Sequence, residues 1–237
     1  MARKPARKAK SESKARAAAP SRGTTDRAKT TDALLELLAE HSFEDIGLAE
    51  VAGRAGIKLS ALRAEFGSTL AIYGAHIKDI DSIVLDGGDD MIDEPGRERL
   101  FDVEMRRLEA LAPYKEAVRS IMRSARRNPG LALALNAMAV RSQGWMLEAA
   151  GISASGPRGA LRAQGAALMF GRVLSVWLDD EEDGVDAAMA ALDRGLSSAA
   201  RWDGFVGDLC SIPSRFMRGS RRRRRPVDEG AVEADAA

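Results

Sequence analysis

The side chains that most often catalyse reactions or bind metals are few in this sequence and lie far apart. The chain has one Cys, Cys210, and two His, His41 and His76. It contains no Gly-rich phosphate loop, no Ser-centred nucleophile motif and no zinc-ligand spacing. The consecutive acids of 179–183 would repel one another, which is typical of a solvated loop and not of an acid–base pair. We therefore predict a protein that is not an enzyme, with no catalytic residues, no metal and no cofactor.

Charge is distributed unevenly along the chain. The formal net charge is +1, yet residues 1–22 carry +7, residues 215–225 carry +7, residues 226–237 carry −4, and the body between the tails carries −9. Blocks of like charge stay disordered and attract polyanions such as nucleic acid or anionic lipid. Two other interpretations remain open: tails that serve only solubility, and an organelle transit peptide at the Arg-, Ala- and Ser-rich start.

No segment resembles a membrane span or a secretory signal. The longest near-continuous apolar stretch, Leu131 to Val140, is too short to cross a bilayer, and the basic N-terminus lacks an apolar core. Together with the single Cys, this predicts a soluble, cytoplasmic protein.

The elements that must position any functional side chain are helices. Apolar residues recur at helical spacing from Asp26 to Trp202, and no stretch alternates as a strand does. Ser68 is a candidate N-cap, Pro95 precedes a helix, and Asn128-Pro129-Gly130 predicts a break. The segment Leu131 to Ala150 is apolar on nearly all faces, which predicts a central helix.

The most informative segment is Gly47 to Phe66, GLAEVAGRAGIKLSALRAEF. It predicts two short helices joined by a turn at Gly56, because glycine adopts the backbone conformation that such a turn requires. Val51, Ala52, Ile57 and Leu62 are spaced to pack the two helices together. The pattern indicates a helix-turn-helix.

A wider run resembles the N-terminal domain of TetR-type transcriptional regulators: ALLELLAEHSFEDIGLAEVAGRAGIKLSALRAEFGSTLAIYGAHI. The resemblance covers about residues 26–80, and its matching positions include Phe43, 48–52, 55–57, Leu62, Phe66, Ser68 and Ala71. It implies an all-α fold with an N-terminal helix-turn-helix domain of three to four helices and a C-terminal bundle of five. It further implies a homodimer that binds double-stranded DNA and a small ligand.

Carried onto this sequence, the resemblance implies that 59–66 is the recognition helix. The side chains that it implies for DNA binding are Arg54, Lys58, Ser60, Arg63 and Thr69. The sequence departs from the family at three positions, with Arg63, Glu65 and Thr69 standing where Tyr, His or Tyr, and Lys are usual. The net charge of segment 26–80 is −3, which opposes binding to phosphates, so that DNA binding would depend on the basic arm or on the local cations.

A second resemblance covers about 97–127, RERLFDVEMRRLEALAPYKEAVRSIMRS, and is to the TetR-fold lipid-binding proteins of ubiquinone biosynthesis. It implies a lipid-binding, membrane-associating accessory protein with a vestigial helix-turn-helix. An apolar stripe from Trp202 to Phe216, followed by the Arg run, favours contact of 202–225 with an anionic membrane surface. The alternative, packing of 202–209 on the bundle beside a solvated tail, remains open.

The helices predicted over 131–150 and 158–178 contain large apolar side chains among small ones, a mixture that can leave a ligand cavity. The candidate ligand-binding residues are Met138, Arg141, Trp145, Met169, Phe170 and Trp177. The same side chains also suit an ordinary core or a dimer interface. Few charges fall on this face, which favours a small apolar or amphiphilic ligand whose polar head Arg141 and Gln143 would orient.

The expected organisation has four parts. Residues 1–25 form a disordered basic arm, and 26–85 form a helix-turn-helix DNA-binding domain with its motif at 47–66. Residues 97–202 form a ligand-binding and dimerisation bundle, and 203–237 form an amphipathic segment with an Arg-rich disordered tail.

Overall fold

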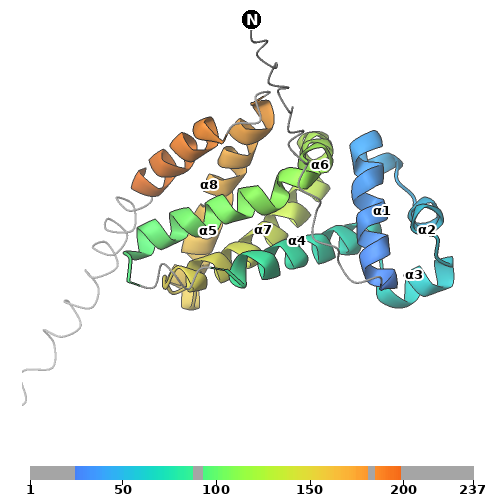
Figure 1. The fold of residues 1–237 in the computed structure, drawn as a ribbon, viewed down its shortest axis with the longest axis horizontal. Helices are drawn as coiled ribbons and strands as arrows, with labels where there is room; N and C mark the ends of the chain where they lie inside the picture. The colour runs from blue at the N-terminus through green and yellow to red at the C-terminus, as the bar shows by residue number, and fades with distance from the viewer. Residues whose placement is uncertain (1–24, 88–92, 181–184, 199–237) are drawn as a thin grey trace, which may run out of the picture. The chain divides into compact units, whose positions relative to one another are not determined.

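The computed structural model describes residues 25–87, 93–180 and 185–198 (Figure 1). Within these ranges the regular structure consists of helices, with no strand. The predicted all-α class is therefore confirmed. The basic arm, the amphipathic segment after Trp202 and the Arg-rich tail lie outside the described residues.

The chain divides into two compact units, Met1–Ala163 and Gln164–Ala237. The sequence analysis placed a domain boundary between residues 85 and 97. In the structure the helix before this loop packs against both the helix-turn-helix and the bundle, so both belong to the first unit. None of the described helices is long and apolar enough to cross a membrane.

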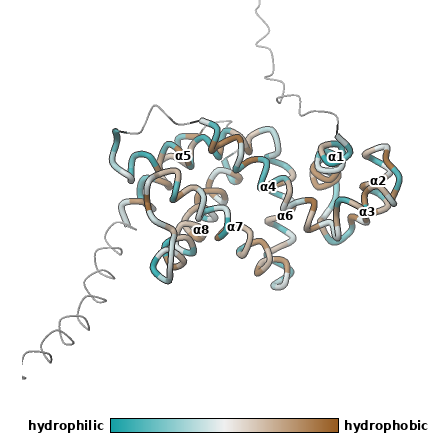
Figure 2. The backbone as a smooth tube through the Cα atoms, turned by 90° about the horizontal axis from the view of Figure 1, so that it is seen from below, coloured by the Kyte–Doolittle hydropathy of each residue, from teal (hydrophilic) through white to brown (hydrophobic). Residues whose placement is uncertain are grey.

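The helix-turn-helix part contains α1 (Asp26–Glu40), η1 (Phe43–Asp45), α2 (Leu48–Ala55) and α3 (Leu59–Glu65). Its core is apolar and tightly closed: Leu34, Leu38, Val51 and Leu62 have no exposed surface. Because α2 and α3 are short, they gain most of their stability from packing against α1. Along α2 and α3 the backbone tube, coloured by hydropathy, changes between hydrophobic and hydrophilic residues (Figure 2).

The helix α4 (Thr69–Leu85) begins where the sequence predicted, because the side chain of Ser68 accepts a hydrogen bond from the N–H of Ala71 at 3.1 Å. It runs from the helix-turn-helix toward α5 and α7 (Figure 1). A single helix thus contributes both to the core beneath the recognition helix and to the bundle.

The bundle of the first unit contains α5 (Gly96–Leu111), η3 (Ala112–Tyr114), α6 (Lys115–Arg127), α7 (Pro129–Ala149) and the beginning of α8 (Gly156–Asp179). Pro95 precedes α5 as expected. Asn128 ends α6 and caps α7, with its side chain accepting from the N–H of Leu131 at 3.1 Å. Pro113 lies in η3, directly before α6.

Two serines of α6 hold the bundle to the link between α1 and η1. The hydroxyl of Ser120 donates to the carbonyl oxygen of His41 at 2.7 Å, and the N–H of Phe43 donates to the Ser124 hydroxyl at 3.2 Å. Ser120 and Ser124 are buried and one helical turn apart, so they face the same way. The link is therefore fixed to α6 by its backbone.

The helix α7 is less enclosed than its composition predicted. Leu133 is 71% exposed and Trp145 is 59% exposed, whereas Ser142, Gln143 and Met146 are buried. The helix predicted to be central packs against α4, α5 and α6, yet the side chains that it buries include polar ones and its outer face retains large apolar ones.

The described part of the second unit consists of residues 164–179 of α8 and a helix over 186–198. These segments approach closely: a Cβ added at Gly195 would lie 2.6 Å from Cγ of Met169. Leu192, Leu196, Phe170 and Trp177 are buried, while Leu168 is 58% exposed.

Candidate nucleic-acid interface and effector site

The turn between α2 and α3 depends on one glycine. Gly56 ends α2 in the left-handed conformation, with φ of 66°, and its N–H donates to the carbonyl of Gly53. The next N–H, of Ile57, donates to the carbonyl of Ala52 at 3.0 Å, which closes the helix end. This local geometry directs the chain into α3, as the sequence predicted.

The helix α3, which the resemblance implies to be the recognition helix, has one buried side and one open side. Leu62 is fully buried and Phe66 is 4% exposed, so both anchor the helix to the core. Lys58, Ser60 and Arg63 are all exposed, and Leu59 between them is 51% exposed. The three polar side chains from the sequence analysis are therefore exposed, with Lys58 as the N-cap of α3 and Ser60 and Arg63 within the helix.

The N-terminus of α4 lies directly after α3. Thr69 is half-buried in its first turn, where the first N–H groups of a helix have no intrahelical acceptor and favour an anion. Nearby, the guanidinium of Arg27 lies over the Phe66 ring at 5.5 Å from its centroid. The N-terminal end of α1, the end of α3 and the start of α4 thus adjoin one another.

Arg54 has a different environment from the other candidate DNA-binding residues. Its guanidinium donates two hydrogen bonds to the Glu40 carboxylate, at 3.0 and 2.8 Å, and lies 3.6 Å from Glu36. The bidentate pair raises the pKa of Arg54 and lowers the pKa of Glu40. Arg54 therefore braces α2 against α1, a role that sequence spacing did not reveal.

The six candidate ligand-binding residues are divided between the two units. Met138 is half-buried against α4, where a Cβ at Gly74 would lie 3.4 Å from its Cε. Arg141 and Trp145 are exposed and line a shallow pocket of about 240 Å³ with Gly144 and Glu148. Met169, Phe170 and Trp177 belong to the second unit.

A buried polar cluster in the bundle was missed by the sequence analysis, except for Gln143. It consists of Asp81 on α4, Glu104 and Arg107 on α5, and Ser142 and Gln143 on α7. Asp81 accepts from the Ser142 hydroxyl at 2.6 Å and pairs with Arg107 at 3.3 Å. Polar residues at otherwise apolar helical positions are the signal that could have identified this cluster.

Two members of the cluster lack conventional partners. Both carboxylate oxygens of Glu104 and both side-chain atoms of the Gln143 amide are buried without a hydrogen bond of normal geometry. Burial raises the pKa of Glu104 to about 7, despite the opposing effects of Arg107 and the Gln143 amide. Burial also raises the pKa of Asp81, against the effects of Arg107 and Ser142. Unsatisfied buried groups of this kind are rare in folded proteins and often mark a functional site.

Metal binding finds no support in the described ranges, where no group of three or more His, Cys, Asp and Glu side chains lies close enough to hold an ion. The acidic run 179–183 lies largely outside those ranges.

Solved structures resemble this chain along most of its length. A TetR transcriptional regulator from Nitrosomonas europaea is 24% identical, covers 74% of this chain and 98% of its own, and superimposes with a TM-score of 0.59. A TetR transcriptional regulator from Rhodococcus sp. RHA1 is 21% identical, covers 73% and 94%, and has a TM-score of 0.53. A putative TetR-family transcriptional regulator from Rhodococcus sp. is 17% identical, with 73% and 97% covered and a TM-score of 0.52.

No family model matches this sequence, and no curated protein does. The structural similarity nevertheless identifies the architecture: the chain has the TetR fold, as the resemblance of residues 26–80 implied.

Proposed function

We propose that this protein is a DNA-binding transcriptional regulator. The observation that carries the proposal is the exposure of Lys58, Ser60 and Arg63 at the N-cap and along α3, a helix that Leu62 anchors to the core of a TetR fold. A helix presented in this way can enter the major groove, where such side chains contact base edges and phosphates. The similar solved proteins are described as transcriptional regulators, which supports the same function.

DNA recognition in this proposal uses two copies of the chain. Helix-turn-helix proteins bind as dimers whose recognition helices meet successive major grooves about 34 Å apart. The start of α4 adds backbone N–H donors for a phosphate beside Thr69. The basic arm before Asp26 adds the long-range attraction that the acidic body does not supply.

Control by a small ligand is the second part of the proposal. The ligand would be amphiphilic, with its polar head at Gln143 and Glu104 and its apolar part among side chains such as Met138. The orphaned atoms of the two polar residues support this assignment, because a ligand that pairs with them removes a desolvation cost. Since α4 extends from this cluster to the helix-turn-helix, a ligand that shifts α4 would change the spacing of the two recognition helices.

The DNA part of the proposal is tested by an electrophoretic mobility shift with genomic fragments at rising salt. We expect a subset of fragments to stay bound at salt concentrations that release the bulk, because specific complexes bind more tightly than non-specific ones. Uniform, weak binding that disappears when residues 1–22 are deleted would show that only the arm attracts DNA.

The ligand part is tested separately, by mass spectrometry of small molecules that co-purify with the protein. We expect an amphiphilic compound that Gln143→Leu loses and Arg126→Gln retains, because Gln143 is buried in the cluster and Arg126 is exposed on α6. Retention of the same compound by both variants would place its site elsewhere.

A further inference from the structure

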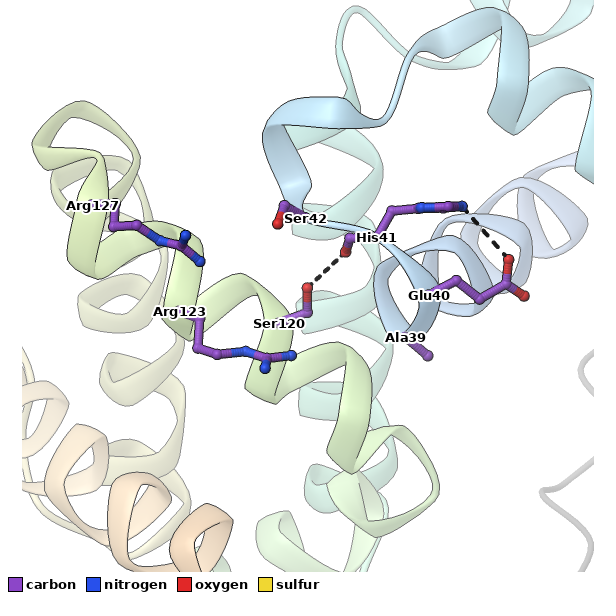
Figure 3. Close-up of a pocket in the computed structure, with 7 residues that line it drawn as sticks. All are labelled: Ala39, Glu40, His41, Ser42, Ser120, Arg123 and Arg127. Carbon is purple, nitrogen blue, oxygen red and sulfur yellow. Dashed lines mark hydrogen bonds and ion pairs between the residues drawn. The ribbon is translucent and has the colours of Figure 1, made fainter.

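A second pocket lies between the end of α1 and one face of α6 (Figure 3). Its volume is about 160 Å³. Residues 39–42 form one wall, and Ser120, Arg123 and Arg127 form the other. The pocket adjoins the hydrogen bond from Ser120 to the His41 carbonyl, which joins the bundle to the helix-turn-helix.

The α6 wall is cationic. Arg123 and Arg127 are one turn apart, both exposed, and their side chains extend from the same face of the helix (Figure 3). Neither guanidinium forms an ion pair within the residues that the structure describes. Arg127 also acts on Glu44, whose pKa is lowered mainly by the Ser124 hydroxyl and to a smaller extent by Arg127.

The single carboxylate in the pocket is already compensated. Glu40 accepts two hydrogen bonds from Arg54 and lies 3.8 Å from Nε2 of His41. Its negative charge is therefore directed toward α2, and the two arginines leave the pocket with a net positive charge. Ser42 adds a hydroxyl on the opposite wall.

We propose that this pocket binds a small phosphate-type oxyanion, held by Arg123 and Arg127 and by the Ser42 hydroxyl. Arginine binds phosphate oxygens through charge-assisted, often bidentate hydrogen bonds. At a share of about 30 Å³ per water, the pocket has space for about five waters, which suits inorganic phosphate or the phosphate group of a small ester. Such an anion would connect α6 to the last turn of α1.

The phosphate in question is a free anion and not the DNA backbone. The pocket lies at the C-terminal end of α1, whereas Arg27 and Phe66 mark the N-terminal end beside α3 and α4. With 15 residues, α1 separates the two ends by about 22 Å at a rise of about 1.5 Å per residue. A duplex on the recognition helix therefore meets the other end of α1.

The test uses the full chain and titrates inorganic phosphate by isothermal calorimetry at constant ionic strength, with chloride as the replaced ion. We expect saturable binding of one phosphate per chain. Arg123→Gln and Arg127→Gln should each weaken it about tenfold or more, since a charge-assisted hydrogen bond is lost. Absence of saturable binding to the wild-type chain would overturn the proposal.

Arg126→Gln is the matched control, because Arg126 is an exposed arginine of the same helix that does not line the pocket. It removes the same net charge and should change phosphate affinity less than about twofold. An equal loss in Arg126→Gln would show diffuse attraction to the helix and no defined site.

Binding of duplex DNA, measured without free phosphate, tests whether the pocket instead contacts the phosphates of the DNA backbone. Arg123→Gln and Arg127→Gln should bind DNA fragments as the Arg126→Gln control does. A selective loss of DNA affinity in the two pocket variants would mean that the pocket contacts the duplex, which contradicts a free-anion site. Phosphate binding is measured directly, so its outcome does not depend on whether the protein recognises DNA.

Discussion

Arg54 and Lys58 are four residues apart in the helix-turn-helix, yet their side chains have different surroundings. The guanidinium of Arg54 is held by Glu40 and Glu36, whereas Lys58 forms no ion pair within the described residues and is exposed. A cation that already has carboxylate partners adds little to the attraction of a phosphate. The two residues therefore contribute differently to DNA binding.

We predict that Lys58→Gln and Arg63→Gln weaken binding to a selected DNA fragment by roughly fivefold or more each, while Arg54→Gln has a smaller effect. Each lost phosphate contact should also lower the slope of log affinity against log salt by about 1. Mobility shifts at several salt concentrations measure both quantities. An Arg54→Gln loss as large as that of Lys58→Gln would contradict the bracing role.

Glu104 makes the stability of the fold depend on pH. Its folded-state pKa of about 7 lies above the ordinary 4.5, so between these values the folded chain keeps a proton that the unfolded chain has released. Stability then falls as pH rises through this interval, by an amount on the order of 3 kcal/mol for a fully buried group. Asp81, whose pKa is raised by the same cause, acts in the same direction.

We predict that Glu104→Gln becomes more favourable relative to the wild type as pH rises from about 5 to about 8, because the amide never ionises. Urea unfolding at several pH values measures the difference in free energy of unfolding. Glu109→Gln, an exposed acid of the same helix, is the control and should show no such trend. If the difference in free energy of unfolding between Glu104→Gln and the wild type does not change with pH, the Glu104 carboxyl ionises in the folded chain as it does in the unfolded chain.

At the scale of the element, the helix-turn-helix contains two glycines that should respond oppositely to alanine. Gly56 has a φ of 66°, which disfavours any side chain, although no atom lies within 4 Å of a Cβ there. Gly53 lies inside α2 with open space around it. At Gly56 the backbone conformation disfavours a side chain. At Gly53 a side chain meets no obstacle, and glycine loses more conformational entropy on folding than alanine does.

We predict that Gly56→Ala lowers the free energy of unfolding by about 1 kcal/mol and Gly53→Ala raises it by about 0.5–1 kcal/mol. Thermal or urea unfolding followed by circular dichroism gives both values. Destabilisation of equal size at the two positions would mean that both glycines are required for close packing.

At the scale of the whole molecule, an exposed leucine on α8 predicts self-association. Leu168 is 58% exposed, with Gly165 and Arg172 exposed on the same side of the helix. A small residue beside a large apolar one allows two helices to approach closely. A homodimer is also what the resemblance of residues 26–80 to TetR-type regulators implies.

We predict that Leu168→Glu converts a dimer into a monomer, because it places a charge in an apolar contact between two copies. Analytical ultracentrifugation measures the change in mass. Leu133→Glu, at a leucine of α7 that is 71% exposed, should leave the dimer intact. Dissociation by Leu133→Glu alone would assign the subunit contact to α7.

Much of the architecture follows from local sequence patterns. The cap at Ser68, the turn at Gly56 and the boundary at Asn128 were all predictable, because each depends on residues within four positions of one another. The all-α class follows from helical spacing for the same reason. The exposure of Lys58, Ser60 and Arg63 was expected from the family resemblance, and Leu62 is spaced to face inward.

Only the tertiary structure decided which polar side chains are engaged and which are open. Arg54 pairs with Glu40 across 14 positions, Asp81 with Ser142 across 61, and Ser120 holds His41 across 79. Charge and periodicity describe each helix by itself, whereas a hydrogen bond between helices depends on how they cross. The amino-acid order therefore determined the helices and the recognition motif, and the packing of α1, α4, α6 and α7 determined the buried cluster and the cationic pocket, because both are built from side chains that meet only after folding.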